Sequence, residues 1–168
     1  MRGKRVKTLK NNRILLGLFV FLLSCEPDDI CLTSIEDTPR LIIGFYDKNT
    51  GELKEVTNLK IQGHDNEEVY IFQTLDSIGI PIKNSDNLTT YSLTKDFNEN
   101  TLNSGNNDNL HINYSYNWEY ISRACGFKTT YELTNLIIEN DSNNWILDTD
   151  LINNNIIDEK NIHVKIFH

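Results

Sequence analysis

A strict period of two along residues 110–120 constrains the fold of this chain more than any other feature of its sequence. Apolar and aromatic side chains occupy the even-numbered positions, and polar side chains occupy the odd-numbered positions, so each kind has one parity. The apolar set is Leu110, Ile112, Tyr114, Tyr116, Trp118 and Tyr120, against His111, Asn113, Ser115, Asn117 and Glu119. Because successive side chains of a β-strand point to opposite faces, this pattern predicts a long strand with one apolar face.

Shorter segments elsewhere repeat the strand pattern. Residues 127–133 alternate after the turn-like pair Cys125-Gly126, and residues 162–166 alternate near the C-terminal end. Residues 40–46 are apolar on both parities, which suits a central strand. Further strands are expected at residues 53–61, 69–75 and 88–94. Turn residues occupy the breaks, at residues 47–51, 63–66, 76–79 and 98–109.

Short strands separated by turns predict an all-β domain, an antiparallel two-sheet sandwich of about seven to nine strands. A small β-barrel is the alternative. The sequence has no convincing helix of ten or more residues, although residues 149–158 could form a short one.

The first 25 residues have the organisation of a bacterial lipoprotein signal. Six basic residues and no acidic residue precede an apolar run at residues 14–23, whose ten residues span about 15 Å as a helix, half of a bilayer's hydrocarbon core. Signal peptides have apolar segments of this length, whereas retained transmembrane helices are longer. The run ends in Leu22-Leu23-Ser24-Cys25, which resembles a lipobox. Cys25 is therefore the expected site of lipid attachment, and a plain secretory peptide is the alternative.

Cleavage before Cys25 would divide the chain into three parts. Residues 1–24 are the expected signal peptide, residues 25–37 a lipidated cysteine with a short acidic tether, and residues 38–168 a single β domain. The mature chain would keep all 24 acidic residues but only 10 of the 16 basic ones, a net charge of −14. This balance argues against nucleic acid as a partner and against electrostatic adhesion to anionic headgroups.

Two cysteines remain once Cys25 carries lipid. These two cysteines, Cys31 and Cys125, can pair with each other, and the cell envelope is an oxidising compartment. A disulfide between them is therefore expected, with two free thiols as the alternative. Cys31 follows Cys25 by six residues, which span about 20 Å when fully extended. The disulfide would therefore hold the domain close to the membrane.

The sequence also resembles a known family. The stretch Cys25-Glu-Pro-Asp-Asp-Ile-Cys31 and the run at residues 38–47 are similar to the start of a family of uncharacterised Bacteroidetes-type lipoproteins, the domain-of-unknown-function 6452 family. Further parts of the same pattern are at residues 56–60, 122–126 and 164–167. The resemblance implies no known activity, ligand or catalytic residue, but it supports Cys31 and Cys125 as a pair.

Three acidic residues soon after Cys25 bear on location. Glu26, Asp28 and Asp29 are similar to the export signal that sends such lipoproteins to the outer face of the outer membrane. This resemblance implies a lipid-anchored protein of the outer membrane that faces the cell surface, with a periplasm-facing orientation as the alternative.

No catalytic residue, metal or cofactor is expected. All four histidines are expected at the surface. His111 and His163 lie on the polar side of their strands, His64 lies in a turn, and His168 is the last residue. Their spacing matches no metal signature. Residues 103–109 and 148–150 offer oxygen ligands for calcium, but not in the order of an EF-hand loop, and Asn-rich turns are common without metal.

The aromatic stripe Tyr114, Tyr116, Trp118 and Tyr120 is the best candidate for a ligand platform. Exposed aromatic rings on one strand face would form a flat stacking surface. Leu110 and Ile112 share the same parity, however, and large aromatic residues usually fill the core, which is the favoured interpretation. The solvent exposure of Tyr116 and Trp118 discriminates between the two.

Two classes of function are compatible with these features. The first is a noncatalytic binding or assembly module, lipid-anchored in the cell envelope, that offers loops or an edge strand to an envelope protein partner. The alternative is a small hydrolase acting on extracellular or cell-wall polymers. The small size and the lack of any catalytic motif favour the module.

Overall fold

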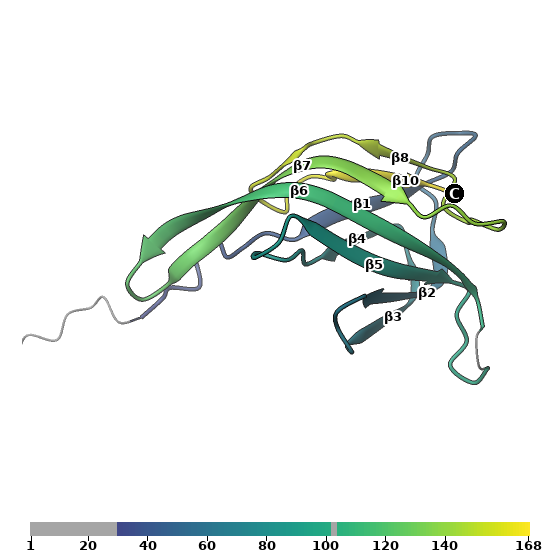
Figure 1. The fold of residues 1–168 in the computed structure, drawn as a ribbon, viewed down its shortest axis with the longest axis horizontal. Coiled ribbons are helices and arrows are strands. Elements are labelled where there is room, and N and C mark those ends of the chain that lie inside the picture. Colours follow the sequence, from purple (N-terminus) through teal and green to yellow (C-terminus); the bar gives the residue numbers. More distant parts are fainter. Residues whose placement is uncertain (1–29, 102–103) are drawn as a thin grey trace, which may run out of the picture.

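The computed structural model describes residues 30–101 and 104–168 (Figure 1). Within these ranges the chain forms ten strands in two sheets and no helix. Accordingly, the described part contains no helix of the length and apolarity needed to cross a bilayer. Cys25 and the expected signal peptide lie outside the described residues.

The smaller sheet has four strands in the order β4-β1-β10-β8. Their bounds are Ser77–Ile80 for β4, Leu41–Tyr46 for β1, Val164–Phe167 for β10 and Asp148–Leu151 for β8. β1 runs parallel to β10, while β4 and β8 are antiparallel to their neighbours. β1 is buried at five of its six residues, which explains why it is apolar on both parities.

The larger sheet has six strands in the order β3-β2-β5-β6-β7-β9, and all neighbouring strands in it are antiparallel. Their bounds are Val69–Leu75 for β3, Val56–Gly63 for β2, Leu88–Lys95 for β5, Asn106–Ser122 for β6, Gly126–Ile138 for β7 and Asn155–Ile156 for β9. β6 and β7 form the longest hairpin, with 17 and 13 residues.

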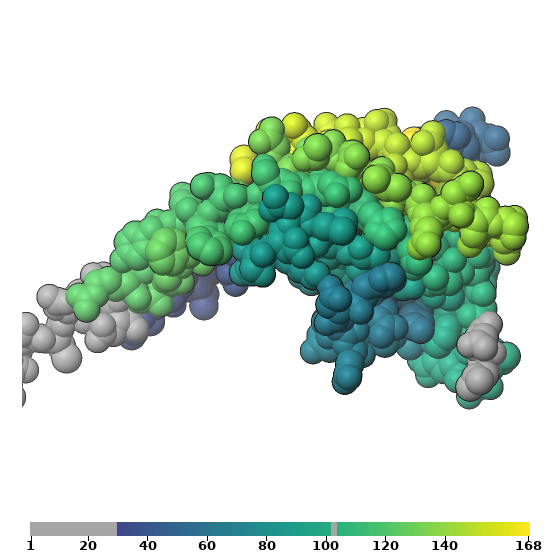
Figure 2. Space-filling view, in the orientation of Figure 1, coloured from purple at the N-terminus to yellow at the C-terminus, as the bar shows by residue number. Residues whose placement is uncertain are grey.

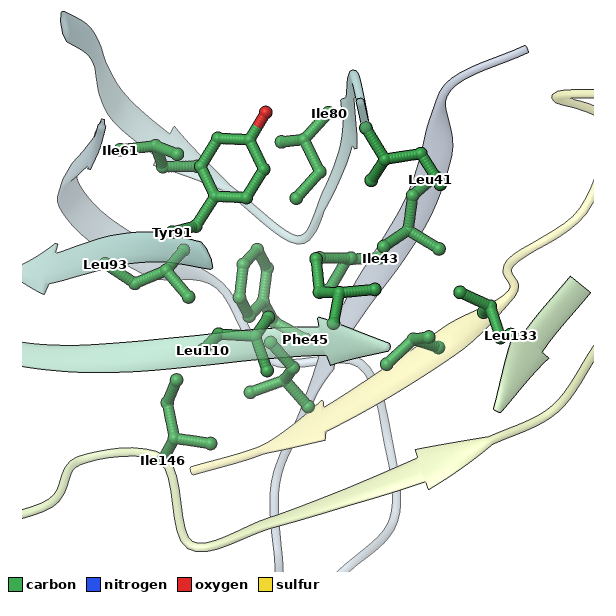
Figure 3. Packing of buried hydrophobic residues seen from close by; sticks show 14 of the residues in the cluster. Leu41, Ile43, Phe45, Ile61, Ile80, Tyr91, Leu93, Leu110, Leu133 and Ile146 are labelled. Atoms are coloured by element: carbon green, nitrogen blue, oxygen red, sulfur yellow. The ribbon is translucent and has the colours of Figure 1, made fainter. Parts of the chain in front are cut away.

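The hydrophobic core lies between the two sheets (Figure 3). The smaller sheet contributes Ile43 and Phe45, and the larger sheet contributes Leu93, Leu110 and Ile112; all five are fully buried. Because neither sheet closes on itself, the two-sheet sandwich predicted from the sequence is confirmed. Its ten strands include one parallel pair, β1 with β10, which the alternation did not reveal.

A β-bulge keeps the apolar side of β7 facing the core. Asn113 pairs with Asn135 and Tyr114 pairs with Leu133, so Thr134 has no residue opposite. The extra residue reverses the parity of the inward positions. Before the bulge, odd-numbered Leu133 is buried; after it, even-numbered residues such as Leu136 pack against the core.

Three local expectations are wrong. Residues 106–109, expected as the end of a turn segment, begin strand β6. Residues 149–158 form strands β8 and β9 rather than a short helix, because pairing with β10 and β7 fixes their backbone. Residues 76–79 are largely strand β4 rather than a turn. Gly79 lies opposite Ile42, and a Cβ added at Gly79 would come within 3.0 Å of the Ile42 side chain, so this glycine serves close strand packing.

Candidate functional site

The β6–β7 hairpin extends beyond the sandwich as an arm, defined here as residues 115–130. Figures 1 and 2 show it projecting from the body of the molecule. Its even-numbered β6 residues continue the face that is the core face at Leu110 and Ile112. Along this face burial ends abruptly: the side chain of Tyr114 is 3% exposed, whereas Trp118 is 60% exposed. Burial of this face of β6 therefore ends within the arm, after Tyr116.

The structure divides the expected aromatic platform into a core part and a surface part. The Tyr114 hydroxyl donates to the backbone carbonyl of Lys83 at 2.9 Å, and the Tyr114 ring packs edge-on against Tyr131. Tyr114 is therefore a core residue, as the favoured interpretation has it and not as part of a platform. The core interpretation is wrong for Trp118 and Tyr120, which are exposed. Tyr116 is partly buried, and Trp118 lies beside it with ring centroids 5.9 Å apart.

Two further aromatic residues face each other near the end of the arm. Tyr120 on β6 is 56% exposed and Phe127 on β7 is 65% exposed. The two residues are paired across the strands, and their rings meet edge to face at 5.3 Å between centroids. On the opposite face of the arm, Lys128 forms an ion pair with Glu119 at 3.4 Å. The end of the arm thus has one aromatic face and one charged face.

A disulfide joins Cys31 to Cys125 at the end of the arm, with 4.8 Å between the Cα atoms. The expected pair is therefore present. Residues 30–39 run from the disulfide along the arm to the sandwich, where the Thr129 backbone N–H donates to Thr38 Oγ1 at 3.0 Å. Beside Cys31, the apolar side chains of Ile30 and Leu32 are exposed.

The larger sheet ends in an open edge strand, β3. Among the described strands β3 pairs with β2 alone. Three consecutive apolar or aromatic residues on it are exposed: Val69, Tyr70 and Ile71. Acidic residues stand on both sides, with Glu67 and Glu68 before the strand and Asp76 after it. An edge strand of this kind presents unpaired backbone N–H and C=O groups to solvent.

A cleft of about 330 Å³ adjoins the beginning of β3. Tyr70, Pro81 and Tyr91 supply its apolar lining, and Asp65 and Lys83 supply an ion pair. Lys83 lowers the pKa of the Asp65 carboxyl through their hydrogen bond. Burial raises the pKa of Tyr91 to about 12, so its hydroxyl stays neutral and donates to the Pro81 carbonyl. The arrangement suits a bound side chain better than proton transfer near neutral pH.

His64 also lines this cleft, next to Asp65. A hydrolase would need a carboxylate or another acceptor to orient the imidazole. The Asp65 carboxylate instead accepts a hydrogen bond from Lys83 Nζ. The cleft therefore brings a histidine and a carboxylate together without arranging them as an acid–base pair.

The surface position expected for His163 and His168 is wrong, because both are buried. His163 directly precedes β10, and its Nδ1 accepts a hydrogen bond from the Ile42 backbone N–H at 3.0 Å. The His168 ring lies edge-on to Phe45 and Trp145. Burial lowers the pKa of both imidazoles. In residues 30–101 and 104–168, no three His, Cys, Asp or Glu side chains are grouped so as to hold a metal ion.

Sequence reasoning identified the aromatic stripe but missed the cleft. The cleft is assembled from residues 63–66, 81–83 and 89–91 together with Tyr70, and no local pattern connects these segments. The open edge was also missed, because residues 69–72 are apolar on both parities, a pattern that suits a central strand, whereas β3 lies at the edge of its sheet.

The described chain is thus a two-sheet β-sandwich with an open edge strand, an adjoining cleft and an exposed aromatic arm. The chain belongs to a family of unknown function, DUF6452, whose family model matches residues 58–168, and the family expected from the sequence is thereby confirmed. The match includes β3, the cleft and the arm. No curated protein and no solved structure matches the chain.

Proposed function

We propose that this protein is a lipid-anchored component of the cell envelope and that its β-sandwich is a noncatalytic binding or assembly module. The observation that carries the proposal is the open edge of β3, with Val69, Tyr70 and Ile71 exposed along it. An extended segment of a partner would add to the sheet as a further strand and pair with the free backbone groups of β3.

The composition of β3 favours such an addition. Proteins usually protect an edge strand with a lysine, a proline or a very short length. β3 has seven residues, Val-Tyr-Ile-Phe-Gln-Thr-Leu, without a charge or a proline. No residue of this strand therefore opposes pairing through a charge or the lack of a backbone N–H.

Charge selects the kind of strand that fits. A second copy of β3 in antiparallel pairing would bring Glu67 and Glu68 near Asp76 of the other copy, and these like charges repel. A partner segment with apolar residues flanked by Lys or Arg would complement both ends. The cleft beside Tyr70 would take one of its side chains and add specificity to the backbone pairing.

The proposed anchor is a lipid on Cys25, after removal of residues 1–24 as a signal peptide. The basic and apolar leader and the lipobox-like end at Cys25 support it. We place the protein in the outer membrane, facing the cell surface, on the basis of Glu26, Asp28 and Asp29. The partner would be another envelope protein, and the acidic mature chain argues against nucleic acid.

Capture of partners from the native envelope tests the binding role. The lipidated protein and an Ile71→Lys variant are compared as baits, with Ile157→Lys as the matched control, because Ile157 is an exposed isoleucine of a loop outside the β3 edge. We expect the parent and Ile157→Lys to capture the same envelope protein and Ile71→Lys to lose it. Equal capture by all three baits would contradict a binding role for the β3 edge.

A further inference from the structure

We infer that the end of the arm, with Tyr120 and Phe127, inserts into the headgroup region of the membrane that holds the lipid anchor. The inference rests on lipid attachment at Cys25, proposed above. It assigns the aromatic end of the arm to a lipid surface and leaves the β3 edge free for a protein partner.

The short length of chain between the anchor and the arm limits how far the arm can lie from the membrane. Cys25 and Cys31 are six residues apart, which corresponds to about 20 Å at full extension. Cys31 is bonded to Cys125, whose Cα atom is 4.8 Å from that of Cys31. A lipid on Cys25 would therefore keep the end of the arm within roughly 25 Å of the membrane surface at all times.

The exposed side chains at the end of the arm are of the kind that favour a lipid surface. Tyr120 and Phe127 form one exposed aromatic pair, and the exposed Leu32 lies next to Cys31, which is bonded to the same end. Tyrosine, like tryptophan, favours the boundary between water and hydrocarbon because its ring is apolar and its hydroxyl is polar, while phenylalanine adds apolar area. A protein surface held this close to lipid would gain free energy by burying such a patch.

The charged face of the arm is compatible with this orientation. The Glu119–Lys128 ion pair lies on the opposite face from Tyr120, so it can stay in water while the aromatic pair enters the headgroups. The mature chain is strongly acidic, and Glu26, Asp28 and Asp29 follow the anchor directly. Electrostatic attraction to anionic headgroups therefore does not contribute, and the apolar and aromatic side chains supply the contact with lipid.

This placement makes the expectation that the disulfide holds the domain close to the membrane more specific. The disulfide fixes the tether to the arm rather than to the sandwich. β3 belongs to the body of the molecule, away from the end of the arm (Figure 1). The arm would thus contact lipid while β3 remains accessible to a partner.

Tryptophan fluorescence of the lipidated protein in phosphatidylcholine vesicles tests the inference. In a Trp118→Phe background, the natural Trp145 is buried, so a tryptophan introduced at position 127 supplies the exposed signal. The matched control carries Leu53→Trp in the same background, because Leu53 is exposed on the body of the molecule. Brominated acyl chains quench a tryptophan that enters the membrane, and acrylamide quenches one that stays in water.

We expect bromolipid quenching several-fold stronger for Phe127→Trp than for Leu53→Trp, with the reverse order for acrylamide. Equal bromolipid quenching of both, in protein that floats with the vesicles, would overturn membrane insertion while leaving the anchor intact. Protection from acrylamide without bromolipid quenching would mean that protein covers the arm, and would also overturn it. If protein that has passed through the lipoprotein-processing pathway does not float with the vesicles, both the lipid anchor and this inference are overturned.

Discussion

Cys31 and Cys125 are bonded to each other although 94 residues separate them in the sequence. The bond fixes the start of the described chain to the turn of the β6–β7 hairpin. Residues 30–39 are thereby held along the arm, where the Thr129 backbone N–H donates to Thr38 Oγ1. The disulfide thus connects the segment nearest the proposed anchor to the end of the arm.

Removing this disulfide should destabilise the protein. For a closed loop of this length, the chain-entropy model gives about 4 to 5 kcal/mol of the free energy of unfolding. We expect the Cys31→Ser, Cys125→Ser double variant to unfold at a lower urea concentration by a corresponding amount, with little change in the slope of the transition. Mixing the parent with a reductant should give the same loss. An unchanged midpoint would contradict a structural role for the disulfide.

Tyr114 and Tyr120 should respond very differently to the same substitution. They occupy the same strand and the same face, but only Tyr114 is buried, with hydrogen bonds at its hydroxyl. We expect Tyr114→Ala to lower the free energy of unfolding by about 3 to 5 kcal/mol, as for large aromatic residues in cores. Tyr120→Ala should cost about 1 kcal/mol or less. Equal losses in urea denaturation would mean that the arm is covered in the free protein.

Alanine substitutions at two glycines with positive φ distinguish the cost of backbone strain from the cost of a steric clash. Gly105 has φ +84 and Gly126 has φ +73, so either alanine substitution should cost about 1 to 2 kcal/mol. A Cβ at Gly105 would also lie 2.5 Å from the Lys95 carbonyl oxygen, whereas nothing lies within 4 Å of one at Gly126. We expect Gly105→Ala to cost about 1 to 3 kcal/mol more than Gly126→Ala in thermal or urea unfolding. A larger loss for Gly126→Ala would contradict the packing at Gly105.

The buried His168 should make the fold less stable as the solution becomes acidic. Burial lowers its pKa in the folded state below the ordinary histidine value of about 6.5, so below that pH the unfolded chain binds a proton that the folded chain does not. The contribution of His168 to stability should therefore be constant above about pH 7 and fall as the pH decreases from about 6.5. His163 acts in the same direction.

A His168→Phe variant isolates this contribution. Phenylalanine preserves an aromatic ring against Phe45 and Trp145 but cannot titrate. We expect the free energy of unfolding of the variant to fall less than that of the parent between pH 7 and pH 5. Parallel pH profiles for the two proteins would show that His168 is protonated equally in both states.

The fold followed from the sequence wherever a strand was covered on one side only. The alternation in residues 110–114 predicted which side chains enter the core, because the period of a strand is a local property. The same alternation continues through Trp118 and Tyr120, which are exposed. Where the covering sheet ends depends on tertiary packing, and the residues of β6 carry no signal for it.

Parity also failed at His163, and for a related reason. Its side chain accepts a hydrogen bond from the backbone of β1, a strand more than a hundred residues earlier. This hydrogen bond offsets the free-energy cost of burying the polar ring. The open edge of β3 was equally hidden, since the position of a strand in a sheet is set by long-range pairing. Only its apolar character on both parities was visible beforehand.

Photo-crosslinking in the native host tests the central claim, that the β3 edge binds an envelope protein. A photoreactive amino acid is introduced in place of Ile71 on β3 or, as the control, in place of Ile157, which is also an exposed isoleucine. The proposal predicts one discrete crosslinked envelope protein from position 71 that is absent from position 157. No crosslink from position 71, or the same products from both positions, would contradict it.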